Sequence, residues 1–230
     1  DPLECTNNCA DNTPNSIAVL AAAPRGTLLH APDCYMDKIA AGPLLKGHVS
    51  LDGGVAYNIE QAAHVLDKSI EEVRIVALDR DRHKQLFSEI HATGAQLDLM
   101  GDGDVSGAIW AAKPDGPYDL LLGIGAAPEG VISATAIRGL GGVFEGRLVF
   151  RSDEEEARAE TMVGDDLTRL WEAHDLCKSD DAIFAASGVC DGYLPGARID
   201  DKTTTTFSEL IDVSTSKVTR DETVRPRTVA

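Results

Sequence analysis

The sequence predicts an α/β fold, a parallel or mixed sheet covered by helices, on the strength of three observations. Short apolar runs rich in β-branched residues alternate with segments whose apolar residues recur at helical spacing. Glycine and proline stand between many of these segments, where turns and helix ends are expected. The sequence contains neither an internal repeat nor a low-complexity linker, so we do not expect independent modules.

The first half of the chain contains the clearest elements. Residues 16–23 (SIAVLAAA) form an apolar run that ends at a Pro-Arg-Gly turn signal, and residues 27–30 are the predicted hairpin partner of this run. Helices are expected over residues 56–66 and 82–92, the second ending at Gly94, and strands over residues 72–79 and 96–100.

The second half continues the alternation and then changes character. Strands are expected over residues 119–123, 147–150 and 182–187, and helices over residues 105–112 and 129–140. Residues 151–177 are charged and predicted to be helical, with the four acids of residues 153–156 in a solvated first turn that suits the helix dipole. Beyond Gly196, a Thr-rich segment predicts edge strands and a loose tail.

The charge of the chain excludes some classes of partner. Lys and Arg number 21 and Asp and Glu 38 among 230 residues, a formal charge of −17. Gripping nucleic acid or an anionic membrane needs a basic face, so we expect neither partner. A small anionic substrate is compatible, because it needs only a local cluster of positive groups and metal. No apolar run reaches the ~18 residues that span a bilayer.

The number and spacing of the cysteines indicate the redox state of the cellular compartment. The five cysteines are scattered and include no Cys-x-x-Cys pair. We therefore expect a reducing compartment, the cytoplasm, or a plastid if the source is eukaryotic.

Polar residues follow three of the predicted strands, at the ends where α/β sheets bind ligands. These junctions are residues 79–83 (DRDRH), 101–104 (GDGD) and 123–130 (GIGAAPEG). Arg80 and Arg82 are suited either to phosphate binding or to surface ion pairs. The acids of residues 101–104 are suited either to binding a ligand or to capping the next helix. The third junction does not indicate a dinucleotide loop, because a proline breaks the glycine pattern and the strand comes late in the chain.

Asp1, Glu4 and Glu129 supply carboxylates of the kind that bind Mg²⁺ or Mn²⁺, and Thr6 lies beside the first two in sequence. Such metals suit phosphate-ester hydrolysis, because they activate water and neutralise the charge on the leaving group. Two acids at the start of a chain are equally compatible with plain solvated groups, so the residues alone leave both interpretations open.

The start of the chain, DPLECT, resembles the DPxEGT or DPxDGT signature of the lithium-sensitive, metal-dependent phosphatases. Four longer runs in the same order resemble class II fructose-1,6-bisphosphatase, including the form that also acts on sedoheptulose 1,7-bisphosphate: TPNSIAVLAAAPRGTLLHAPDCYMDKIAAGP, LDRDRH, GDGDVSGAI and LLLGIGAAPEGVISATAIRGLGG. The likeness is strong to about Gly142, weaker over residues 182–189 and poor in the tail.

The resemblance implies a fold, a reaction and partners. The fold is a layered α/β/α/β/α sandwich whose N-terminal part is missing here, with residues 1–45 as the remnant of a metal-binding subdomain and residues 46–230 as a substrate-binding subdomain with a polar tail. The reaction is Mn²⁺- or Mg²⁺-dependent hydrolysis of the 1-phosphate of fructose 1,6-bisphosphate, in gluconeogenesis or the Calvin cycle. The partners are the sugar bisphosphate and further copies of the chain in a dimer or tetramer.

The resemblance also implies roles for individual residues. Asp1, Glu4 and Glu129 would bind metal, and Thr6 would orient the attacking water, with Glu4 as its catalytic neighbour. The substrate would contact Glu4, Cys5, Thr6, Tyr35, Arg80, Asp81, Arg82, Asp102, Gly103, Asp104 and Ala126, with Gly125 lining the same pocket.

The chain departs from the family pattern in ways that define two alternatives. Cys5 replaces a glycine whose backbone we expect to need positive φ or a close approach to phosphate, Asn8 replaces an apolar residue, and residues 198–210 replace a glycine-rich, Arg-containing stretch. The family takes further metal carboxylates from a region upstream of its DPxEGT motif, so we expect weak turnover or none here. The alternatives are a degenerate, non-catalytic sugar-phosphate-binding paralogue and an inositol-monophosphatase-like enzyme.

Overall fold

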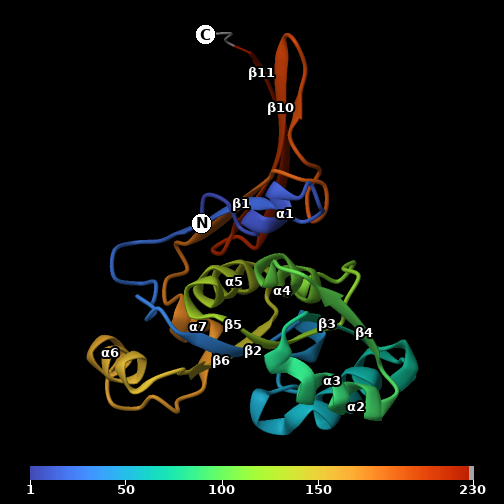
Figure 1. The fold of residues 1–230 in the computed structure, drawn as a ribbon, viewed down its shortest axis with the longest axis vertical. Helices are drawn as coiled ribbons and strands as arrows, with labels where there is room; N and C mark the ends of the chain where they lie inside the picture. The colour runs from blue at the N-terminus through green and yellow to red at the C-terminus, as the bar shows by residue number, and fades with distance from the viewer. Residues whose placement is uncertain (228–230) are drawn as a thin grey trace.

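The computed structural model describes residues 1–227, and these residues stack in four layers (Figure 1). The layers are, in order, α2 (Gly54–Leu66) with α3 (Lys84–Thr93), a six-stranded sheet, α4 (Asp104–Ala112) with α5 (Ala127–Leu140), and a five-stranded sheet. The predicted α/β class is confirmed, and the order of the layers agrees with four of the five layers of the predicted sandwich. No helix within residues 1–227 is both long and apolar enough to cross a bilayer.

The six-stranded sheet is mixed, in the order β4-β3-β5-β2-β6-β7. Its strands are β2 (Tyr35–Ala41), β3 (Arg74–Leu78), β4 (Gln96–Met100), β5 (Leu120–Ala126), β6 (Val143–Val149) and β7 (Trp171–Glu172). β3 runs parallel to β4 and β5, whereas β2 runs antiparallel to β5 and β6. β2 lies in the middle of the sheet although no strand was predicted there, and β5 extends three residues beyond its predicted end at residue 123.

The five-stranded sheet joins segments from both ends of the chain. Its strands are β1 (Ile17–Ala22), β8 (Ile183–Gly188), β9 (Arg198–Ile199), β10 (Thr203–Asp212) and β11 (Lys217–Pro226). The predicted hairpin between residues 16–23 and 27–30 is wrong, because β1 pairs with β8 over six residues and Leu28 makes only an isolated bridge to Cys177. Pairing with β8 places Ile17 and Val19 in the apolar layer beneath the sheet, which a local hairpin does not offer.

Two further expectations in the last third of the chain are wrong. Residues 151–177 do not form one helix: α6 (Asp153–Val163) stops before Gly164, whose φ is 91°, and β7 and the short α7 (Ala173–Leu176) follow. The tail is not loose either, because β10 and β11 form a hairpin with ten paired positions that projects away from the helices (Figure 1). The remaining elements are α1 (Thr6–Ala10) and short 3₁₀ turns at Pro43–Leu45, Leu51–Gly53, Ile70–Glu72 and Asp81–His83.

The middle layer, α4 and α5, is buried on both faces, which explains its many small residues. An added Cβ at Gly107 of α4 would lie 3.0 Å from Leu121 of the six-stranded sheet, and one at Gly139 of α5 would lie 2.5 Å from Ile211 of the five-stranded sheet. Small side chains therefore allow both helices to pack closely between two sheets. Residues 1–45 contribute β1 to one sheet and β2 to the other, and their assignment to a separate subdomain stays a prediction.

A buried polar cluster ties the five-stranded sheet to the end of α4. Glu209 of β10 accepts hydrogen bonds from the Lys113 ammonium at 2.7 and 2.8 Å, from Arg220 Nε at 2.9 Å and from the Tyr193 hydroxyl. The Glu209 side chain is fully buried and that of Lys113 nearly so. Burial alone would raise the pKa of Glu209, but the bonds from Lys113 and Tyr193 outweigh it, so this pKa lies below the ordinary 4.5.

Glu209→Gln is expected to lower the free energy of unfolding by about 3–5 kcal/mol at pH 7, because it leaves the buried Lys113 charge without its counter-ion. The pKa of Glu209 is lower in the folded chain than in the unfolded chain, so protonating Glu209 favours unfolding. The stability that Glu209 contributes is therefore fully present above about pH 4.5 and is lost as the pH falls. Urea unfolding at pH 7 and between pH 5 and pH 3 measures both effects. The exposed Glu60→Gln on α2 is the control, and an equal loss in the two variants would contradict the assignment.

Candidate active site

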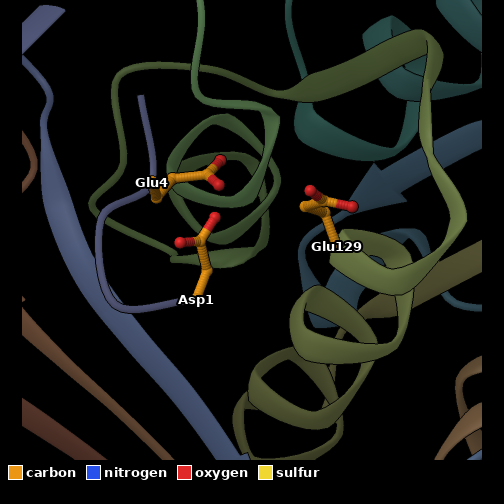
Figure 2. Close-up of side chains that lie close together, drawn as sticks. All are labelled: Asp1, Glu4 and Glu129. Atoms are coloured by element: carbon orange, nitrogen blue, oxygen red, sulfur yellow. The ribbon is translucent and has the colours of Figure 1, made fainter. Parts of the chain in front are cut away.

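Three carboxylates converge where the N-terminal segment meets α5 (Figure 2). One ligand oxygen each from Asp1, Glu4 and Glu129 lies within 4.8 Å of the other two. Glu4 is held by backbone bridging to Ile17 at the start of β1, where its N–H donates to the Ile17 carbonyl at 2.9 Å. Glu129 projects from the first turn of α5. The structure therefore brings together all three residues predicted to bind metal.

The electrostatics of this cluster fit a bound divalent cation. Burial, together with the nearby charges of Asp104, Glu129 and Asp102, raises the pKa of Glu4 to about 8, and Lys38 offsets this only in part. Glu129 Oε2 is buried and has no hydrogen-bond partner within residues 1–227. Hard carboxylate oxygens that lack a partner and repel one another are the donor set that Mg²⁺ or Mn²⁺ prefers.

A buried ion pair lies beside the carboxylates. Lys38 Nζ of β2 donates to Asp104 Oδ2, at the start of α4, over 2.6 Å, and the two side chains are 1% and 10% exposed. An added Cβ at Gly125 of β5 would lie 1.9 Å from that oxygen and 3.0 Å from the ammonium, so only glycine fits there. Asp104 was predicted to contact substrate, whereas Lys38 was not predicted at all.

The loop after β4 packs against the start of the chain. Arg80 Nη1 donates to the carbonyls of Asp79 and Gly101 at 2.9 and 2.5 Å, and Nη2 lies 3.5 Å from Asp102 Oδ1. Gly103 has a φ of 100°, and a Cβ added there would lie 2.9 Å from Cys5 Sγ. The predicted residues of the first two junctions thus meet each other and Cys5.

The ring of Tyr35 is in contact with two arginines. The guanidinium groups of Arg82 and Arg151 lie over the Tyr35 ring, 4.6 and 4.7 Å from its centroid. Arg82 Nε and Nη2 both donate to the Ile124 carbonyl, at 3.0 and 2.6 Å. Arg151 is paired with Glu155, which is buried instead of lying in a solvated first turn. Sequence reasoning missed Arg151, because an Arg followed four residues later by Glu is typical of an ordinary helix start.

The other predicted residues lie at different distances from this cluster. Thr6 is exposed on the first turn of α1, and Ala126 ends β5 opposite Tyr35. Asp81 points away: its side chain is 93% exposed and pairs with Lys84 at 2.8 Å. The structure therefore does not bring the Asp81 carboxylate to the other candidates.

His83 is a packing residue, buried behind the arginines. The Ile124 N–H donates to His83 Nε2 at 2.7 Å, so Nδ1 carries the proton and donates to the Leu78 carbonyl, also at 2.7 Å. Burial lowers the pKa of His83, which keeps the ring neutral. These bonds hold the Arg80–Arg82 segment against β5.

Cys5 occupies the left-handed backbone region, with φ 63° and ψ 55°. Of the two conditions considered for the family's glycine, positive φ is the one that this backbone adopts. Its side chain is buried, and burial, followed by the charge of Glu4, raises the pKa of the thiol well above its usual range. A neutral, buried thiol is a packing group and not a nucleophile.

The chain is similar to one family over nearly its whole length. A sequence model of that family, described as "Bacterial fructose-1,6-bisphosphatase, glpX-encoded", matches residues 1–225. A curated protein from Prochlorococcus marinus (strain MIT 9303), named D-fructose 1,6-bisphosphatase class 2/sedoheptulose 1,7-bisphosphatase, is 42% identical over 225 residues, which are 92% of this chain and 67% of that protein. A protein of the same name from Gloeobacter violaceus is 41% identical over 213 residues, 86% of this chain and 61% of that protein. The chain spans about two thirds of the length of these relatives.

Cys5→Gly is expected to be more stable than Cys5→Ala by about 1 kcal/mol, because only glycine adopts φ 63° without a Cβ penalty. Both variants lose the thiol, so their difference isolates the backbone. Urea unfolding at pH 7 measures it. At the exposed helical position Glu60 of α2, the same Gly and Ala replacements should differ in the opposite direction. An alanine variant as stable as the glycine variant at position 5 would refute backbone strain there.

Proposed function

The chain belongs to the bacterial, GlpX-type fructose-1,6-bisphosphatase family, and we propose that it carries the phosphate-releasing site for the 1-phosphate of fructose 1,6-bisphosphate and sedoheptulose 1,7-bisphosphate. This family consists of metal-dependent phosphatases. The observation that carries the proposal is the convergence of the Asp1, Glu4 and Glu129 carboxylates (Figure 2). The named relatives are bisphosphatases, which supports this function over the inositol-monophosphatase-like and non-catalytic alternatives.

We assign Mn²⁺ or Mg²⁺ to the three carboxylates. When bound, the ion neutralises phosphate charge and lowers the pKa of a water molecule, the two contributions that ester hydrolysis needs. Glu129 offers a buried oxygen that has no other partner, and Glu4 offers a carboxylate that burial otherwise keeps protonated near neutral pH. The Thr6 hydroxyl, two residues after Glu4, orients the attacking water.

The arginines bind the phosphate that is not hydrolysed. Arg82 is tethered to Ile124 through Nε and Nη2 and stacked on Tyr35, which fixes the plane of its guanidinium group before substrate arrives. Arg80 is tethered to two carbonyls in the same way. A guanidinium group held in place loses little conformational entropy when it binds a phosphate, so binding of the remote phosphate positions the scissile ester.

The sugar lies between these two ends. We assign the hydroxyl groups of the sugar to Asp102, whose side chain is 33% exposed, whereas the Asp104 carboxylate is buried against Lys38 and supports the site from behind. Gly125 and Ala126 line the same space from β5. We place the reaction in the cytoplasm, in gluconeogenesis or the Calvin cycle, without nucleic acid or membrane partners.

Glu129→Gln is expected to weaken Mn²⁺ binding at least tenfold, because a neutral amide replaces one of three charged ligands. Free Mn²⁺ counted by electron paramagnetic resonance gives the affinity. The wild-type chain should also melt at a higher temperature in Mn²⁺, since the ion binds only the folded state. Glu60→Gln is the matched control, and equal Mn²⁺ affinity in the two variants would argue against a metal centre.

Arg82→Ala is expected to weaken binding of fructose 6-phosphate at least tenfold, since it removes a pre-oriented phosphate ligand. Isothermal titration calorimetry measures this in the absence of metal, so the result does not depend on turnover. Arg25→Ala, on an exposed turn, controls for loss of positive charge. Unchanged affinity in Arg82→Ala would remove Arg82 from the substrate site.

In the presence of Mn²⁺, the chain is expected to release phosphate from fructose 1,6-bisphosphate at least ten times faster than from inositol 1-phosphate. EDTA should abolish the release, because the carboxylates alone supply no Lewis acid. A phosphate assay coupled to identification of fructose 6-phosphate tests this. Faster release from inositol 1-phosphate, or release that EDTA does not change, would contradict the proposed reaction.

A further inference from the structure

The 3₁₀ turn that follows β3 continues the hydrogen bonding of β5. β3 pairs with β5 over residues 120–121, and Ile124 lies beyond that pairing. Both backbone groups of Ile124 bind side chains of the turn: its N–H donates to His83 Nε2 over 2.7 Å, and its carbonyl accepts from Arg82 Nε and Nη2 at 3.0 and 2.6 Å. One residue of β5 therefore links the histidine to the arginine.

The surroundings of the histidine ring fit one tautomer. His83 is buried, and its other nitrogen, Nδ1, lies 2.7 Å from the Leu78 carbonyl, which can only accept a hydrogen bond. Nδ1 therefore carries the proton, and Nε2 is the acceptor for Ile124. The Phe87 ring of α3 packs edge-to-face against the imidazole, with the centroids 5.9 Å apart, and this contact opposes rotation of the ring.

β5 leaves room for the ring at one residue. A Cβ added at Gly123 would lie 3.0 Å from both Cε1 and Nε2 of His83, and the φ of Gly123 is 132°, a backbone conformation that favours glycine. The peptide plane that carries the Ile124 N–H follows directly after this glycine. Position 123 therefore allows the histidine contact both by shape and by backbone conformation.

The surroundings also keep the ring neutral. Burial is the largest influence and lowers the pKa of His83; the Arg82 guanidinium lowers this pKa further, whereas Asp37 of β2 raises it. Burial in turn raises the pKa of Asp37, and Arg147 of β6 opposes that shift. An imidazolium would present an N–H to the Ile124 N–H, so only the neutral ring makes this contact.

We propose that His83 is a positioning residue for the phosphate that the substrate keeps. By accepting from the Ile124 N–H, it holds the Ile124 carbonyl where that carbonyl fixes the plane of the Arg82 guanidinium. This role depends on the phosphate-binding function proposed for Arg82, whose N–H groups outside the tether remain for the phosphate. His83 itself does not act on the substrate.

Loss of the acceptor is expected to reach the phosphate site through the backbone. Without Nε2, the Ile124 N–H has lost its partner, which costs free energy. Turning the Gly123–Ile124 peptide toward another acceptor relieves that cost, but it moves the Ile124 carbonyl as well. Arg82 is then no longer held in one orientation, and it loses more conformational entropy when it binds a phosphate.

Two substitutions separate the two bonds of the ring. In His83→Gln, the amide oxygen is as many bonds from the backbone as Nε2 and can accept from Ile124; in His83→Asn, the amide nitrogen matches Nδ1 and keeps only the bond to Leu78. Calorimetric titration of the metal-free chain with fructose 6-phosphate at pH 7 measures the effect. We expect His83→Asn to weaken binding at least tenfold, as Arg82→Ala does, and His83→Gln to stay within about threefold of the wild type.

Two controls accompany these variants. His91→Asn, at an exposed position of α3, controls for the loss of a histidine. The affinity for Mn²⁺ should be the same in both His83 variants, because the three carboxylates lie on other segments, whereas general unfolding would lower it. If Arg82→Ala binds fructose 6-phosphate as tightly as the wild type, the proposed phosphate site fails. If Arg82→Ala binds weakly but His83→Asn and His83→Gln bind equally, the role of His83 alone is overturned.

Nuclear magnetic resonance tests the tautomer in the wild-type chain. Long-range ¹H–¹⁵N spectra distinguish an Nδ1–H ring from an Nε2–H ring or an imidazolium, and the His83 signals are those that His83→Gln lacks. We expect the Nδ1–H tautomer at pH 7. Hydrogen exchange of the Arg82 Nε–H should also be at least tenfold faster in His83→Asn than in His83→Gln. An Nε2–H ring or an imidazolium at pH 7, or equal exchange in the two variants, overturns the proposal.

Discussion

The buried ion pair between Lys38 and Asp104 organises the centre of the molecule. It joins a strand in the middle of the six-stranded sheet to the first turn of a helix in the layer above, and both side chains are almost fully removed from water. Taking two charges out of water is costly, so such a pair persists only where the geometry is good. Gly125 contributes to that geometry by having no Cβ, since any other residue would overlap Asp104 Oδ2.

The same pair sets the charge of the site. Lys38 is the buried cation beside several acids, and its charge is already matched by Asp104 at 2.6 Å. It therefore offsets the negative charge around Glu4 only in part. The pKa of Glu4 therefore stays raised and Asp1, Glu4 and Glu129 remain an acidic cluster, while Arg82 and Arg151 lie over the Tyr35 ring. This separation supports a cation at one end of the proposed substrate and a phosphate at the other, within a chain of charge −17.

The local pattern of apolar residues predicted most of the fold. It failed where contacts between distant segments determine the secondary structure. Most helices and strands from residue 56 to residue 150 were found from apolar spacing, although β6 starts at Val143, four residues before its predicted start. β2 was missed because its sequence, YMDKIAA, contains a lysine that is buried only by virtue of Asp104, far along the chain. The Thr-rich segment does form a strand, β10, as predicted, but the loose tail predicted after it is wrong, because the polar sequence of β11 gives no apolar alternation.

The candidate site shows the same division. Family-like motifs indicated Asp1, Glu4 and Glu129, and the structure brings them together. No motif in the sequence indicated Lys38 or Arg151. Lys38 matters through its ion pair with Asp104, and Arg151 through its contact with the Tyr35 ring, and both contacts join distant segments. Asp81 shows the converse: its neighbours Arg80 and Arg82 turn toward the site, while its own side chain faces solvent. Adjacent residues in a 3₁₀ turn point in different directions, so sharing a motif does not place them on one face.

Cys5 connects backbone geometry to the shape of the site. Its positive φ places the thiol against Gly103, which itself has a φ of 100° and no room for a Cβ. The two positions are coupled: while a side chain occupies position 5, position 103 can hold only glycine, for steric as well as conformational reasons. The close approach of Cys5 to Gly103 packs the loop that contains Asp102 against the segment that contains Glu4. The Cys5 side chain therefore acts on the neighbouring loop through packing.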